Sequence, residues 1–303
     1  MQGAEPAGLL SLPRRPLRHR TRGATVACVR AVLVALLFGL STASAAEPAL
    51  RAGVVPDSPP FVLADRTGHL TGFSVALIQA IGARLKRDVV FTEAPLPALF
   101  AGLADGKLDV LPGPVQATPE RAADMLFTEG YLWSEYQFGT APGIKLATLG
   151  DLRGKRLAVH EGSDYAEWAQ RSGGRLGFVA VPQPTLAAVF EAVRSGRADA
   201  SLTSSSALRA ATAGHSKLTA ALALPETRTH ESLAVAESAV ELRDEIEEAL
   251  RCLKQSGAVA RLSAIWLGSK PGPEDLENLV IPGYGVPGLA GYDPKQHKPR
   301  CEK

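Results

Sequence analysis

Residues 99–121 read LFAGLADGKLDVLPGPVQATPER, and residues 189–204, VFEAVRSGRADASLTS, repeat the pattern of their first half. Aligned on Phe100 and Phe190, both stretches follow apolar–Phe–x–x–apolar–x–x–Gly–basic–x–Asp. Beyond the shared Asp they diverge, because the first copy continues to Arg121 whereas the second enters a run of serines. The repeat predicts two similar α/β lobes, in each of which a short helix leads into a central strand.

Alternating strand and helix patterns surround both copies of the repeat. Residues 50–55 form a short apolar strand, and 72–88 are predicted to be a helix because apolar residues recur there at every fourth position: Phe73, Leu77, Ile81 and Leu85. Such alternation predicts a mainly parallel sheet covered by helices, with ligands bound at the carboxyl ends of the strands, in 111–121 and 202–210. Further strands are expected at 89–95, 108–114, 131–141, 156–163, 177–182, 198–205 and 231–238, and further helices at 97–104, 164–173, 185–196, 240–257 and 258–268.

The N-terminus differs in composition from the rest of the 303-residue chain, which is 46% hydrophobic and 21% charged. An Arg-rich segment precedes the apolar run 31–40 and the small residues that follow it, a pattern that predicts a secretory signal peptide over 1–45. Ten apolar residues are too few for a membrane span, which needs about 20. An uncleaved anchor and a translation start downstream of 2–23 remain open alternatives.

The charge of the chain depends on this leader. The leader carries six Arg and one Glu, so its removal takes the formal net charge from +2 to −3. A mature chain without a basic excess argues against nucleic acid as a partner.

Two of the three cysteines, Cys252 and Cys301, lie outside the leader. In an exported chain they predict one disulfide, although two unpaired thiols remain possible. Cys252 falls near the border of the apolar face of the helix at 240–257, where the Gly- and Pro-rich tail 269–303 can bring Cys301 to it. The apolar residues of this tail predict that it packs on the body of the protein. No cysteine or histidine spacing suggests a metal site, so no cofactor is predicted.

The chain from 50 to 268 resembles bacterial extracellular solute-binding proteins of the polar amino-acid type, family 3. The resemblance rests on ordered motifs: PPF at 59–61, GxxTGF at 68–73, DGKLD at 105–109 and TPER at 118–121. It implies an α/β protein of the type II periplasmic-binding-protein fold, whose two lobes close about a two-crossing hinge around a small ligand. Its divisions would be lobe 1 at 47–138 and 230–268, lobe 2 at 139–229, and a C-terminal tail at 269–303.

The resemblance also implies where a ligand carboxylate binds. Arg121, in a T-x-x-R context, matches the family's carboxylate clamp, and an Arg guanidinium can hold a carboxylate through two parallel hydrogen bonds. Gly162, Ser163 and Asp164 match the loop at a helix N-terminus that binds the same carboxylate from lobe 2. The alternatives are that Arg121 is a solvated residue in a first helical turn and that Ser163 or Asp164 is only an N-cap.

This sequence departs from the family at the group that accepts the ligand ammonium. The family has an Asp at the position of Ser204, and hydroxyl residues where this chain has 113–116. An unpaired ammonium in a closed cleft is costly, so the departure favours a small carboxylate or an atypical amino-acid-like ligand unless Asp164 or Glu161 replaces the acid. The predicted ligand-binding residues are Ser58, Phe61, Gly113, Gln116, Arg121, Gly162, Ser163, Asp164, Tyr165 and Ser204.

The resemblance implies a monomeric periplasmic substrate-binding protein that serves an ABC importer in the inner membrane and is not an enzyme. Two alternatives stay open. Some relatives on this scaffold are periplasmic dehydratases, and His160, Glu161 and Asp164 could do general acid–base work. Other relatives are sensor or partner-docking proteins.

Overall fold

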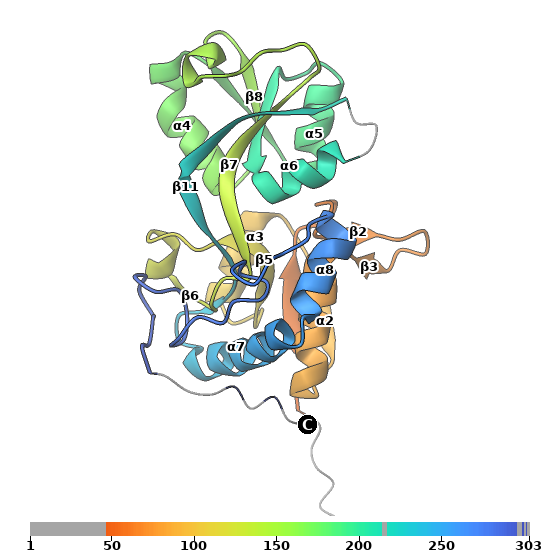
Figure 1. Cartoon of the computed structure of the whole chain (residues 1–303), viewed down its shortest axis with the longest axis vertical. Helices are drawn as coiled ribbons and strands as arrows, with labels where there is room; N and C mark the ends of the chain where they lie inside the picture. The colour runs from red at the N-terminus through yellow and green to blue at the C-terminus, as the bar shows by residue number, and fades with distance from the viewer. Residues whose placement is uncertain (1–46, 214–216, 296–298, 300, 302–303) are drawn as a thin grey trace, which may run out of the picture. The chain divides into compact units, whose positions relative to one another are not determined.

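The computed structural model describes residues 47–213, 217–295, 299 and 301, so the predicted signal peptide at 1–45 lies outside the described residues. Within those ranges no helix is long and apolar enough to cross a membrane. The described chain is an α/β protein with two lobes, and two long strands run from one lobe to the other (Figure 1).

Lobe 1 is built around a parallel strand pair packed against helices. Strands β1 (Leu50–Val54) and β4 (Val89–Glu93) pair in parallel, and Ala52 of β1 also forms an isolated parallel bridge to Val110, the residue before the next strand. The helix predicted at 72–88 is found as α2 (Phe73–Leu85), with Phe73, Leu77 and Ile81 fully buried. The remaining elements of the lobe are β2 (Leu63–Ala64), β3 (Leu70–Thr71), α3 (Leu96–Ala104), β5 (Leu111–Gln116), the 3₁₀ turn η1 (Arg121–Ala123), β6 (Met125–Phe127), α7 (Val240–Gln255) and α8 (Ala258–Leu267).

Lobe 2 repeats the arrangement on a smaller scale. Strand β8 pairs in parallel with both β9 and β10, as the βαβ pattern predicts. A separate apolar cluster that includes Phe138, Leu157 and Leu202 forms its core. The elements are η2 (Leu149–Leu152), β8 (Arg156–His160), α4 (Asp164–Leu176), β9 (Val179–Gln183), α5 (Leu186–Arg194), β10 (Ala200–Ser204) and α6 (Ser205–Thr212).

Two strands connect the lobes. Strand β7 (Leu132–Thr140) lies between β11 (Thr219–Ala236) and β10 in a seven-stranded sheet of order β5-β11-β7-β10-β8-β9, with β6 also paired to β11. The prediction of a mainly parallel sheet is therefore wrong, because both crossing strands pair antiparallel with their neighbours. The strand expected at 231–238 begins at Thr219 instead, and the predicted lobe boundaries at 138/139 and 229/230 fall inside β7 and β11.

The repeated Asp has the same structural role in both lobes. The carboxylate of Asp109 accepts hydrogen bonds from the backbone N–H of Arg51, at 2.8 Å, and from its guanidinium. Asp199 accepts the corresponding bonds from Arg156, again 2.8 Å from the backbone nitrogen. The shared motif therefore fixes the chain before each central strand to the first strand of its lobe, and the repeat in itself does not form the ligand site.

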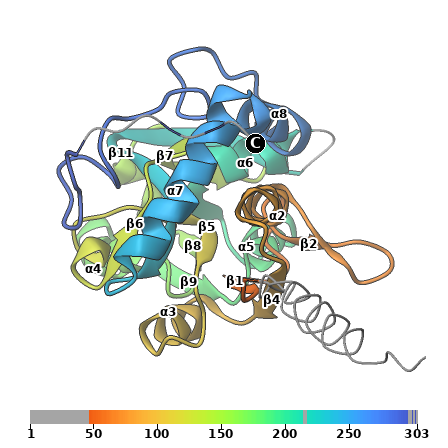
Figure 2. The same ribbon diagram turned by 90° about the horizontal axis from the view of Figure 1, so that it is seen from below.

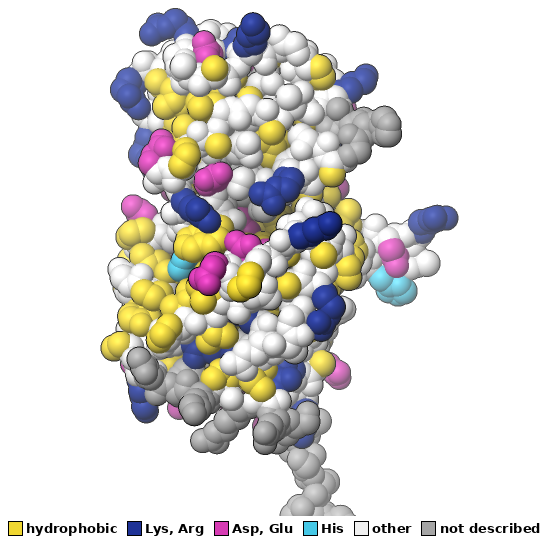
Figure 3. Space-filling view, in the orientation of Figure 1, with side chains coloured by type: hydrophobic (Ala, Val, Ile, Leu, Met, Phe, Trp, Pro, Cys, Tyr) yellow, Lys and Arg dark blue, Asp and Glu magenta, His cyan; other side chains and the backbone are white. Residues whose placement is uncertain are grey.

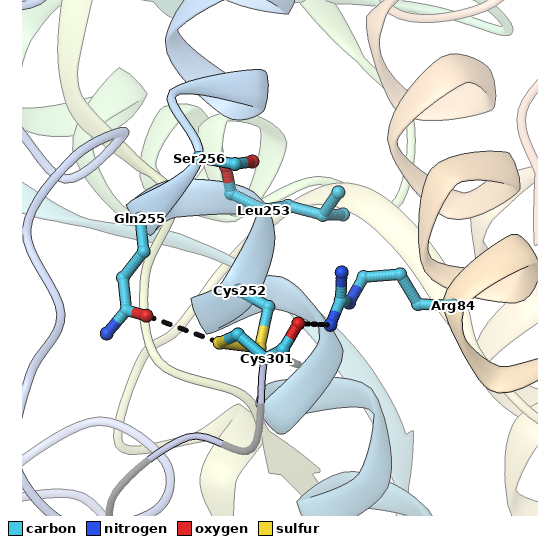
Figure 4. The surroundings of a disulfide bond; sticks show 6 residues. All are labelled: Arg84, Cys252, Leu253, Gln255, Ser256 and Cys301. Carbon is cyan, nitrogen blue, oxygen red and sulfur yellow. Dashed lines mark hydrogen bonds between the residues drawn. A yellow bond between two sulfur atoms is a disulfide. The ribbon is translucent and has the colours of Figure 1, made fainter. Parts of the chain in front are cut away.

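The tail beyond α8 packs on the body, as predicted. Leu276 is fully buried and Val286 is 8% exposed. The predicted disulfide between Cys252 and Cys301 is confirmed, with an S–S distance of 2.04 Å (Figure 4). The backbone carbonyl of Cys301 also accepts a hydrogen bond from Arg84 of α2, at 3.2 Å.

Buried charges of α7 hold the tail alongside this helix (Figures 1 and 2). The Lys254 ammonium donates to the carbonyl of Leu279 at 2.9 Å, and the Arg243 guanidinium donates to the carbonyl of Gly291 at the same distance. Glu247 accepts the backbone N–H of Gly285 at 2.8 Å. Helix α7 thus buries a polar face under the tail in addition to the apolar face that its sequence predicts.

Candidate ligand-binding site

A cavity of about 90 Å³ lies where β5, β10 and the start of α4 meet, at the strand ends predicted to bind a ligand. This volume is several times the roughly 10–15 Å³ that one water molecule needs, so a small solute can enter. Most of the lining is apolar and comes from both lobes, for example Phe61 and Leu99 from lobe 1 and Leu186 from lobe 2. Such an apolar cavity with a few polar groups is typical of small-molecule sites.

The structure brings nine of the ten predicted residues to this cavity, and Gly162 is the exception. Gly162 has a φ of +72°, and a Cβ there would lie 2.7 Å from Cγ of Pro97 in the other lobe. Gly162 therefore permits the close approach of the two lobes. The residues that line the cavity are Ser58, Phe61, Gly113, Gln116, Arg121, Ser163, Asp164, Tyr165 and Ser204.

Arg121 is largely enclosed, with 12% of its side chain exposed, so the solvated alternative is wrong. Its backbone N–H donates to the hydroxyl of Thr118 at 3.3 Å, which fixes the turn η1. The guanidinium lies over the ring of Phe100, 5.2 Å from its centroid, and Nη1 lies 3.6 Å from a carboxylate oxygen of Asp164. The buried Nη2 has no hydrogen-bond partner among the described residues. Arg121 therefore lines the cavity with one guanidinium nitrogen that no described residue pairs.

Asp164 faces Arg121 from the opposite lobe. Ser163 is the N-cap of α4, since its hydroxyl accepts from the backbone N–H of Ala166 at 3.3 Å, and this places Asp164 in the first turn with 7% exposure. Burial raises the pKa of the Asp164 carboxyl, and the nearby Arg121 charge and Tyr136 hydroxyl oppose that rise. The carboxylate lies where an Arg-bound anion would be expected, so Asp164 is positioned to compete with a ligand for Arg121.

Neither predicted substitute for the missing acid takes its place at Ser204. The Ser204 hydroxyl caps α6, accepting from the backbone N–H of Ala207 at 3.2 Å. Glu161 is exposed and does not line the cavity. Asp164 lies beside Arg121, which is the carboxylate-binding side of the site.

An acid that was not predicted from the sequence, Glu231, also lines the cavity. Glu231 is 1% exposed and lies on β11, directly across from Gln116 of β5. Burial raises its pKa to about 8, against the lowering effect of the neighbouring Ser134 and Ser206 hydroxyls. The alternation of side chains along a strand could have indicated that Glu231 is buried, because Glu231 lies two and four residues before Leu233 and Val235, which are fully buried.

Gln116 connects the lobes across the cavity. Its amide nitrogen donates to the Tyr165 hydroxyl at 2.8 Å and to the Ser134 hydroxyl at 2.9 Å, while its amide oxygen has no partner within the described residues. Gly113 is needed for packing, since a Cβ there would collide with the hydroxyl of Tyr131. The Gln116–Tyr165 hydrogen bond and the Arg121–Asp164 pair therefore join the two lobes at the cavity.

A second hollow, of about 290 Å³, contains none of the predicted residues. Basic and acidic side chains are intermixed on the face between the lobes in Figure 3. The hollow is lined by cations and anions in equal number, Arg209, Arg228, Lys270, Glu135, Asp275 and Glu277, so it does not favour a ligand of either charge. The described part of the chain also contains no group of three or more His, Cys, Asp or Glu that could hold a metal ion.

Comparison with known proteins places this site in a family. Residues 50–269 match the family of bacterial extracellular solute-binding proteins, family 3. The chain is 26% identical over 211 residues to a probable amino-acid ABC transporter-binding protein of Haemophilus influenzae, covering 69% of this chain and 80% of the relative. It is 26% identical over 175 residues to the histidine-binding periplasmic protein of Salmonella typhimurium, covering 56% of this chain and 67% of the relative. A solved ancestral arginine-binding protein bound to arginine aligns with a TM-score of 0.68 and 25% identity, over 74% of this chain and 100% of that structure.

Fold and site together define a two-lobed solute-binding protein of the type II periplasmic class. The chain belongs to the bacterial extracellular solute-binding proteins, family 3, because the match covers most of its length. The resemblance found in the sequence is thereby confirmed.

Proposed function

We propose that this protein captures a small amino-acid-like solute, bearing a carboxylate or another hydrogen-bond acceptor, between its two lobes. The observation that carries the proposal is the enclosed Arg121, which lines the cavity and whose buried Nη2 has no hydrogen-bond partner among the described residues. A buried cationic donor left unpaired is unfavourable, so a ligand acceptor would satisfy it. The apolar walls would hold the rest of the solute.

The proposed cellular location of the protein and its proposed partner rest on the family, and the cavity gives no information about either. A secreted protein released to the periplasm by cleavage of the 1–45 segment would deliver its solute, as a monomer, to an ABC permease of the inner membrane. The names of the Haemophilus and Salmonella relatives support this role. The ten predicted residues, apart from Gly162, would be the ligand contacts.

One observation favours a second function. Glu231 is a buried carboxyl in the cavity whose pKa is raised to about 8, which suits a general acid at neutral pH. A dehydratase-like enzyme would convert a bound solute, whereas a binding protein would return it unchanged. Mass spectrometry of each bound solute after prolonged incubation distinguishes the two.

A thermal-shift screen of ligand-free protein against common amino acids and small carboxylates tests the proposed function. A ligand at a hundred times its Kd stabilises the folded state by about 2.7 kcal/mol, which moves the melting temperature measurably. We expect at least one small solute to raise it. A protein that no member of either class stabilises would contradict the proposal.

A further inference from the structure

The polar atoms left unpaired in the cavity describe the ligand that would complete it. Five side chains of the lining have a buried polar atom without a partner among the described residues: Gln116 Oε1, Glu231 Oε2, Asp164 Oδ2, His160 Nε2 and Arg121 Nη2. With Glu231 ionised, acceptors outnumber donors, since Arg121 Nη2 is the cationic donor of this set. A ligand that satisfies this set donates several hydrogen bonds and accepts at least one. A protonated amine donates up to three and has no lone pair to offer, so it fits the acceptor side.

Glu231 is the group best placed to receive such an amine. It lies on the central strand β11, beside Gln116, so the two side chains share one face of the sheet and both line the cavity. Its Oε1 lies 3.5 Å from the Ser206 hydroxyl, and its Oε2 has no hydrogen-bond partner among the described residues. The hydroxyls of Ser134 and Ser204 also lie near enough to lower its pKa. No cationic side chain within the described residues pairs with it, in contrast to Asp164, which Arg121 faces at 3.6 Å.

We propose that Glu231 binds the ammonium group of the ligand and thereby replaces, from the returning strand of the hinge, the acid that Ser204 lacks. This inference rests on the proposed function and names the ligand class of the same site: a small, largely apolar solute with a protonated amine. The amine meets Glu231 and Gln116, and an acceptor at its other end meets Arg121. Because Asp164 already partly neutralises Arg121, that acceptor can be a carboxylate or a neutral oxygen.

Glu231 also couples binding to pH. Burial keeps it protonated below about pH 8 in the free protein, and pairing with an ammonium requires the carboxylate, so binding releases a proton. The charge of Asp164 of α4 raises the pKa of Glu231, and the charge of Glu231 in turn raises the pKa of Tyr165 of α4 and of Tyr131 before β7. Burial is the largest cause of the raised pKa of Asp164 and of both tyrosines. His160 lines the same cavity, and burial lowers its pKa, so it stays neutral above pH 7.

The experiment compares wild type with Glu231→Gln, a substitution that keeps the shape of the side chain and removes its charge. Glu191→Gln, on the exposed side of α5, is the matched control, and Glu161→Gln tests the acid on the loop before α4. The probes are the common amino acids, together with triads that separate the two ends of the ligand. Each triad joins an amino acid to its des-amino acid and its decarboxylated amine: leucine, isocaproate and isoamylamine; phenylalanine, hydrocinnamate and phenethylamine; alanine, propionate and ethylamine.

We expect wild type and Glu191→Gln to bind amine-bearing probes more tightly than des-amino acids. Glu231→Gln should lose about 10- to 100-fold in affinity for the amine-bearing probes and none for the others. This loss corresponds to one charge-assisted hydrogen bond. Tighter binding of the amino acid than of its decarboxylated amine would identify a carboxylate as the acceptor at Arg121. The wild-type Kd should fall about ninefold from pH 6 to pH 7 and level off above pH 8, while the Kd of Glu231→Gln should not change.

Three outcomes overturn the inference. Undiminished binding of amine-bearing probes by Glu231→Gln excludes Glu231 as the acceptor, and a loss seen with Glu161→Gln instead assigns the role to that residue. A wild-type preference for des-amino acids also excludes an ammonium site. In each of these three cases the protein still binds a solute, so the proposed function stands. A wild-type protein that binds no probe overturns the proposed function itself.

Discussion

Replacing Cys301 with Ser should destabilise the protein by removing the cross-link between α7 and the tail. The two cysteines are 49 positions apart, and the chain-entropy relation gives about 4 kcal/mol for a loop of this length. The cross-link acts mainly on the unfolded chain, while buried contacts such as Lys254 to Leu279 keep the tail docked in the folded protein. The variant should therefore fold and lose about 2–4 kcal/mol of unfolding free energy.

Urea unfolding followed by the fluorescence of Trp133, Trp168 and Trp266 measures this loss. With a slope of about 3 kcal/mol per molar urea, the midpoint should fall by roughly 1 M, and the slope should rise because the open chain exposes more surface. Reduced wild type is the control and should behave like the variant. A midpoint that falls by less than about 0.2 M, with or without reductant, would refute the view that this disulfide constrains the chain.

Two further substitutions test the site. Asp164→Asn should lower the melting temperature of the free protein, because Arg121 loses its buried partner. The same variant should bind carboxylate probes such as hydrocinnamate several-fold more tightly, because Asp164 no longer competes with them for Arg121. Weaker carboxylate binding in calorimetry would contradict this competition. Gly162→Ala should weaken ligand binding several-fold, because the added Cβ would meet Pro97 across the cleft. Gly196→Ala is the control, since Gly196 has a similar positive φ and no neighbour within 4 Å. Equal ligand affinities in the two variants would show that Gly162 does not limit closure of the lobes.

The sequence predicted elements best where hydrophobic periodicity is strong. The helix around Phe73, Leu77 and Ile81 appears within a few residues of its predicted ends. The crossing strand β11 was predicted too short, because its first half, from Thr219, is rich in Ala, contains Pro225 and is mostly exposed or half-buried. Its antiparallel pairing with β7 depends on residues distant in sequence, which is why the sheet was expected to be mainly parallel.

The site was predictable where a local motif marks it. Arg121 and Asp164 were predicted from local motifs, and both line the cavity. Their contact with each other could not be predicted in this way, because it depends on how the two lobes meet. Glu231 lies in a strand that carries no motif, so only its phase with Leu233 and Val235 indicated burial. The buried charges of α7 could not be recognised, because the tail that covers them follows in the sequence without a pattern that predicts where it packs.

Calorimetric titration of the wild type and Arg121→Ala with the most stabilising solute tests the central claim most directly. We expect one site per chain in the wild type and no detectable binding by the variant. The melting temperature of the free variant should fall somewhat, because Asp164 loses its buried partner, but the variant should remain folded at the temperature of the titration. Equal affinity in the wild type and Arg121→Ala would contradict ligand capture in this cleft.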